Sequence, residues 1–94
     1  MRAIDTIFGP TKRPAGAGAT VTIRSARAED RSALAVLAAL DSSPAPDGEV
    51  LVAEVGGELW AAQPVDGARG IADPFRPSGE LAFLLAARAR QLAA

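Results

Sequence analysis

Glu54 and Glu58 are the two side chains of this sequence whose type and position would allow them to act as a general base. They stand on either side of an expected turn at Gly56-Gly57. The sequence contains no histidine, tyrosine or cysteine, so the commonest proton-transfer groups and thiolate nucleophiles are absent. Glutamates at strand ends are usually solvated. We therefore assign no catalytic residue, and we expect no metal site.

Composition argues against several classes of partner. Ten basic residues stand against eleven acidic ones, and the net charge of -1 creates no field that would attract nucleic acid or an anionic membrane. No apolar run approaches the roughly 20 residues that span a bilayer. The lack of cysteine is compatible with a reducing compartment. We expect a soluble, cytoplasmic protein that binds other proteins.

The first 20 residues have the composition of a flexible tail. Residues 9–18 are rich in glycine and proline, as in a linker. Ahead of this linker, Ile4, Ile7 and Phe8 follow the spacing of one helical face, which would suit docking into a groove. We predict a tail over residues 1–20 and one small domain over residues 21–94.

The domain is expected to begin with a strand and a helix. Val21 and Ile23 alternate with polar residues over positions 21–25, as in a half-buried strand. A helix should follow from Ala28, with Glu29 and Asp30 favoured by the dipole of its first turn. The residues expected on its buried stripe are Leu34, Leu37, Ala38 and either Val36 or Leu40. Prolines and a glycine between residues 41 and 48 should end this helix.

The second half predicts a hairpin, a short strand and a last helix. Apolar residues over 50–55 and 58–63 flank Gly56-Gly57, which is typical of a two-residue turn. Residues 69–72 predict a weak strand, and Ser78 should cap the final helix. The leucines expected to hold that helix on the sheet are Leu81, Leu84, Leu85 and Leu92. We predict an α+β fold in an α/β-like order, with an antiparallel sheet of about four strands and two helices.

Three large side chains are candidates for an interaction site. Trp60 is expected to pack across the sheet or into an oligomer contact, with Leu59 pointing the other way; lining a ligand pocket is the alternative. Phe75 and Arg76 lie between prolines and could form a recognition loop. The other possibility is that Phe75 covers the end of the core and Arg76 is solvated.

The order of these elements resembles the N-terminal half of the GNAT family of N-acetyltransferases. The resemblance covers about residues 21–72 and rests on Ile23-Arg24 with Ala26 and Asp30, and on the hairpin sequence at residues 52–59. It implies that the next loop, at residues 76–81, donates backbone N–H groups to the pyrophosphate of acetyl-CoA. Ser78 and Gly79 are the residues that would bind this cofactor.

The same loop departs from the family pattern in two ways. Pro77 has no N–H to donate, and Glu80 brings negative charge towards the position of the pyrophosphate. We therefore expect a degenerate GNAT-like domain that binds no cofactor and serves as a protein interaction or assembly module. It would form a homodimer, with the strand at 69–72 as its open edge.

Two alternatives remain open on the sequence alone. In one, the protein is an acetyl-CoA-dependent N-acetyltransferase whose cofactor site is completed by a partner chain. In the other, it is an unrelated small α+β binding protein that uses the apolar residues of its tail.

Overall fold

A computed structural model describes residues 20–93 and confirms the predicted α+β class. The elements are β1 (Val21–Ser25), a 3-10 turn η1 (Ala28–Asp30), α1 (Arg31–Leu40), β2 (Val50–Val55), β3 (Glu58–Pro64), β4 (Ile71–Ala72) and α2 (Gly79–Ala93). The four strands form one sheet in the order β1-β2-β3-β4, and each neighbouring pair is antiparallel. The strand predicted at 69–72 is thus an edge strand of two residues.

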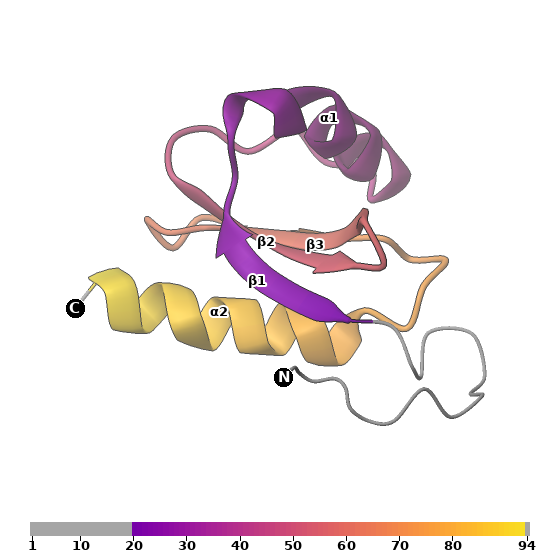
Figure 1. Ribbon diagram of the computed structural model, residues 1–94. Helices are drawn as coiled ribbons and strands as arrows, with labels where there is room; N and C mark the ends of the chain where they lie inside the picture. The colour runs from indigo at the N-terminus through magenta and orange to yellow at the C-terminus, as the bar shows by residue number, and fades with distance from the viewer. Residues whose placement is uncertain (1–19, 94) are drawn as a thin grey trace.

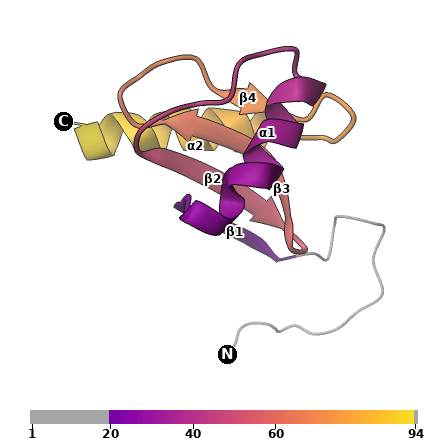
Figure 2. The same cartoon turned by 90° about the horizontal axis from the view of Figure 1, so that it is seen from above.

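The two helices cover opposite faces of the sheet, so the domain has three layers (Figure 1). Viewed from above, α1 lies across the sheet while α2 runs behind it (Figure 2). One core cluster lies under α1 and contains Leu34, Leu37, Ala38, Val50, Val52, Ala62 and Ile71. The other lies under α2 and contains Leu51, Ala53, Ala61, Leu85 and Ala89. β2 contributes to both, which explains its almost unbroken apolar sequence.

The hairpin of β2 and β3 forms at the predicted turn. Gly56 and Gly57 both have positive φ, 58° and 89°. A two-residue turn whose backbone matches the twist of the strands needs positive φ at both positions, and glycine adopts it without a steric penalty. The two glycines therefore fix where the chain reverses.

A β-bulge interrupts this hairpin and corrects one expectation. Ala53 pairs with Ala61 but Glu54 pairs with Leu59, so Trp60 is an extra residue on β3. Leu59 packs against the α1-side cluster, and Trp60 lines a cavity on the same side. The prediction that Leu59 points away from Trp60 is wrong, because the bulge suspends strict alternation.

Helix α1 uses a narrower stripe than predicted. Leu34, Leu37 and Ala38 are buried as expected. Val36 and Leu40 are 60% and 39% exposed, so neither completes the buried stripe. A ten-residue helix on a small sheet contacts it along one line of residues three and four apart.

Helix α2 also packs through fewer leucines than predicted. Leu85 is fully buried and Ala89 nearly so, and Leu81 packs beside them. Leu84 and Leu92 are 46% and 48% exposed, which corrects their assignment to the core. The contact line follows the four-residue spacing 81, 85, 89, and the alanine on it lets the helix approach closely.

These exposures predict different costs for two neighbouring truncations. Leu85→Ala should lower the free energy of unfolding by about 2–5 kcal/mol, because it leaves a cavity between α2 and the sheet. Leu84→Ala, the matched control, should cost less than about 1 kcal/mol. Urea unfolding followed by circular dichroism measures both values. Equal losses would mean that α2 is rotated about its axis relative to this packing.

Candidate functional site

A cavity of about 460 Å³ lies on the α1 side of the sheet, at the turn end of the hairpin. Trp60, Leu59 and Leu37 provide its apolar lining. The Arg76 guanidinium lies 5.3 Å from the centre of the Trp60 ring, within the range of a cation–π contact. Arg76 Nη2 also donates to Glu58 Oε1 at 2.6 Å. Two of the predicted interaction residues, Trp60 and Arg76, thus meet at one place.

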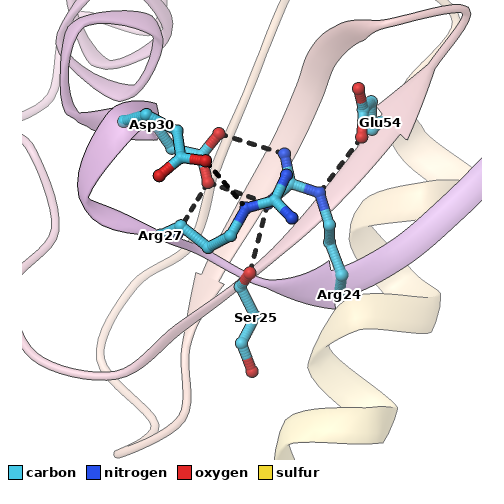
Figure 3. A network of polar contacts seen from close by, with 6 residues as sticks. Arg24, Ser25, Arg27, Asp30 and Glu54 are labelled. Carbon is cyan, nitrogen blue, oxygen red and sulfur yellow. Dashed lines mark hydrogen bonds and ion pairs between the residues drawn. The ribbon is translucent and has the colours of Figure 1, made fainter.

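Arg24 is the centre of a polar network beside this cavity (Figure 3). Its Nη1 and Nη2 donate to the two carboxylate oxygens of Asp30 at 2.8 and 3.0 Å. Its Nε donates to Glu54 Oε1 at 3.1 Å. The backbone N–H of Arg27 donates to Asp30 as well, at 2.6 Å. The guanidinium therefore ties β1 to the start of α1 and to β2.

The network fixes the charge of Asp30. The hydrogen bonds from Arg24, and then the one from the Arg27 backbone, hold the pKa of Asp30 well below its ordinary value. The same contact with Asp30 raises the pKa of Arg24. A carboxylate held so firmly in its charged form cannot exchange a proton near neutral pH. Asp30, predicted only as a charge in the first helical turn, is thus a buried structural anchor.

The two candidate bases are both engaged by arginines. Glu54 accepts from Arg24, and Glu58 accepts from Arg76. Both carboxylates border the cavity that contains Trp60. Their shared role in the structure is to hold a guanidinium in place.

Ser78 and Gly79, the predicted cofactor-binding residues, lie at the start of α2. The Ser78 carbonyl accepts from the Ala82 N–H, as expected of a capping residue. Its hydroxyl, however, donates to the Asp73 carbonyl at 2.9 Å, and Ser78 is only 5% exposed. Gly79 is exposed, and a Cβ added there would meet no neighbour within 4 Å. Neither the Ser78 hydroxyl nor the missing side chain of Gly79 is therefore arranged for binding an anion.

The remaining predicted residues are not gathered at this cavity. Phe75 is 78% exposed, so the idea that it covers the end of the core is wrong. Its N–H donates to Asp73 Oδ1 at 2.8 Å, which fixes the loop and leaves the ring outside. The tail residues Ile4, Ile7 and Phe8 lie outside the described residues.

A second surface, which we call the β1–α2 face, was not anticipated from the sequence. It comprises the exposed apolar side chains Val21 and Ile23 of β1 and Leu84 of α2, which are 40–49% exposed. Val21 and Ile23 pair with Val55 and Ala53, and Ala53 belongs to the cluster under α2, so they point to the α2 side of the sheet. Within the described residues, neither helix makes an extensive contact with β1.

The position of α2 explains why this face stays open. Ala86, Arg90 and Ala93 line a cavity with the loop between β3 and β4. Helical geometry places Leu84 on the opposite flank, towards β2 and β1, whereas Leu92, seven residues after Leu85, continues the contact line near the C-terminal end of the helix. The alternation at Val21 and Ile23 predicted a half-buried strand, but both side chains are exposed, because no element of residues 20–93 covers them. Within the described residues, the lack of a helix over β1 follows from the position of α2 under β2 and β3, which the sequence alone does not predict.

Neither helix within residues 20–93 is long and apolar enough to cross a membrane. Over the same residues, no group of three or more acidic side chains is placed to hold a metal ion.

Comparison of the chain with known protein families, with curated proteins and with solved structures found no match. Its function must therefore be argued from its own residues and their geometry.

The lowered pKa of Asp30 predicts how stability depends on pH. The carboxylate stabilises the fold above the unfolded pKa of about 3.9, and this contribution is lost as the pH falls towards the folded value. Asp30→Asn should lower the free energy of unfolding at pH 7 by about 3 kcal/mol, the low end for a broken buried pair, because Arg24 keeps Glu54. The difference from wild type should shrink below about pH 4. Urea unfolding across this pH range measures it.

Glu29→Gln is the matched control, since this neighbouring carboxylate has a side chain 73% exposed and should contribute little at any pH. A difference between wild type and Asp30→Asn that does not change with pH would contradict the anchoring role of the charge.

Proposed function

We propose that this chain is a GNAT-like domain that acts as a protein interaction or assembly module and does not transfer acetyl groups. The observation that carries the proposal is the β1–α2 face. Three large apolar side chains from two elements lie exposed on one side of a domain whose described part has only 74 positions, residues 20–93. Exposed apolar side chains gathered on one face, beside an open strand edge, are typical of a binding surface.

The chemistry of the opposite face supports binding better than catalysis. The arginines beside the Trp60 cavity are paired with carboxylates, and Asp30 is fixed in its charged form. Such a network holds elements together and offers no group poised to give or take a proton. It supports a structural role for the residues that carry the family resemblance, Arg24 and Asp30.

The start of α2 supports the loss of acetyl transfer. The Ser78 hydroxyl is used by the Asp73 carbonyl, and the Ser78 N–H donates to the Arg76 carbonyl at 2.8 Å. Pro77 has no N–H, and Glu80 adds a negative charge in the first turn. A pyrophosphate needs free N–H groups directed at it, so these residues do not fit one.

Titration of the full chain with acetyl-CoA tests the catalytic half of the proposal. We expect no saturable heat by isothermal calorimetry at up to about 1 mM cofactor, since the Ser78 N–H already donates to the Arg76 carbonyl and Pro77 has no N–H. Glu80→Gln should not create binding. A saturable micromolar signal would refute the proposal and favour an acetyltransferase.

Photo-crosslinking tests the interaction half. A benzophenone amino acid placed at Leu84, on the β1–α2 face, should give covalent adducts with a protein in cells that express the full chain. The control is the same probe at Ser32, an exposed position on α1. Adducts at position 84 well above those at position 32 are expected. Equal yields at both positions, or none, would contradict a binding role for this face.

A further inference from the structure

We propose that the partner of the β1–α2 face is a second copy of this chain, joined through an antiparallel β1–β1 contact centred on Ile23. The proposal rests on the function proposed above and names the partner. It would merge two four-stranded sheets into one sheet of eight strands. Along its outer edge, β1 presents backbone N–H and C=O groups that no other strand of the described fold bonds.

The hydrogen bonds to β2 identify which residues of β1 face the open edge. The Thr20 carbonyl accepts from Gly56, and the Ala26 N–H donates to Val50. Since hydrogen-bonded pairs alternate along an antiparallel ladder, the even-numbered residues of β1 bond to β2. Val21, Ile23 and Ser25 consequently point their N–H and C=O groups outwards, and the Ser25 carbonyl also accepts from Arg24 Nη1 at 3.2 Å.

These three residues form a self-complementary set. When two β1 strands pair antiparallel with Ile23 opposite Ile23, Val21 of each copy faces Ser25 of the other. Each of these pairs is of the hydrogen-bonded kind, so every outward N–H meets a C=O of the second copy. A two-fold axis through Ile23 therefore satisfies all the outward groups of the strand.

The charge of Arg24 favours this pairing register over the neighbouring one. With Ile23 on the axis, Arg24 of each copy lies opposite Thr22 of the other. A shift that brought Arg24 opposite Arg24 would place two like-charged residues directly across from each other, which is less favourable. Arg24 is the one charged residue of β1, and its guanidinium is paired within its own chain with Asp30, Glu54 and the Ser25 carbonyl. The edge thus lacks the lysine or proline that commonly blocks pairing.

Burial gives the contact its driving force. Ile23 is 40% exposed and would pack against its counterpart on the α2 side. Val21, 49% exposed, lies on the same face, and Leu84 is 46% exposed on the flank of α2 that is turned towards β1. The other edge strand, β4, has only two residues and runs into Pro74. The homodimer edge expected at residues 69–72 is therefore better placed at β1.

Sedimentation of the full chain tests the dimer. We expect a concentration-dependent dimer, and Ile23→Lys should raise its dissociation constant at least about tenfold by placing two lysines on the axis. Phe83→Lys is the matched control, because Phe83 is 69% exposed on α2 and should leave association unchanged. Circular dichroism confirms that both variants fold. A chain that stays monomeric up to about 1 mM would overturn the proposal.

Cysteine substitution tests the register, since the chain has no cysteine of its own. Ile23→Cys should cross-link on mild oxidation, because paired Cα atoms about 5.5 Å apart lie within disulfide range. Thr22→Cys and Phe83→Cys should form disulfide-linked dimers at least about tenfold more slowly. Cross-linking at position 22 or 83 as fast as at position 23 would overturn the proposed pairing.

The two proposals fail in distinguishable ways. A monomer whose position 84 still cross-links to a different protein would refute self-pairing and leave the interaction module intact. Adducts with the mass of two copies would support both proposals. No adduct at position 84, together with a monomer in sedimentation, would overturn both.

Discussion

The guanidinium of Arg24 is the contact on which the arrangement of the domain depends. It joins three parts of the fold, because β1 carries it, Asp30 ends η1 immediately before α1, and Glu54 lies on β2. Neither helix packs extensively on β1. The strand is therefore held by its ladder with β2 and by this one side chain. A planar fork that meets both oxygens of a carboxylate also fixes direction, so the first helix starts at a defined angle to the sheet.

Local signals in the sequence were sufficient to predict the helices and strands. They were insufficient to predict which side chains of these elements are exposed. The paired glycines and the alternating strands predicted the hairpin because turn chemistry is local. Leu84 and Leu92 were misassigned because which flank of a helix is buried depends on how far the sheet extends beneath it. The bulge at Trp60 could not be predicted from the local sequence, since Leu59 and Trp60 are both large apolar side chains. The same holds for the site. Trp60 and Arg76 were predicted as interaction residues, but the contact between them is visible only in the tertiary fold.

Small side chains set the thickness of the core. Ala53 and Ala61 are fully buried at the centre of the sheet, and Ala89 faces them from α2. Alanines at a helix–sheet contact permit close approach, but each contributes little apolar area. The domain compensates by burying β2 on both faces. It leaves β1 as the strand whose apolar residues are least covered, which makes association a natural way to complete the core.

The bulge on β3 has a spectroscopic consequence. Trp60 is the only tryptophan, and the sequence has no tyrosine, so the near-ultraviolet emission of the whole protein arises chiefly from one indole. That indole is 8% exposed, has a guanidinium over its ring and has an Nε1 with no hydrogen-bond partner among the described residues. Its fluorescence therefore reports on a single point, where the hairpin, α1 and the loop carrying Arg76 meet. Trp60 is thus an intrinsic fluorescence probe of the contact between these elements.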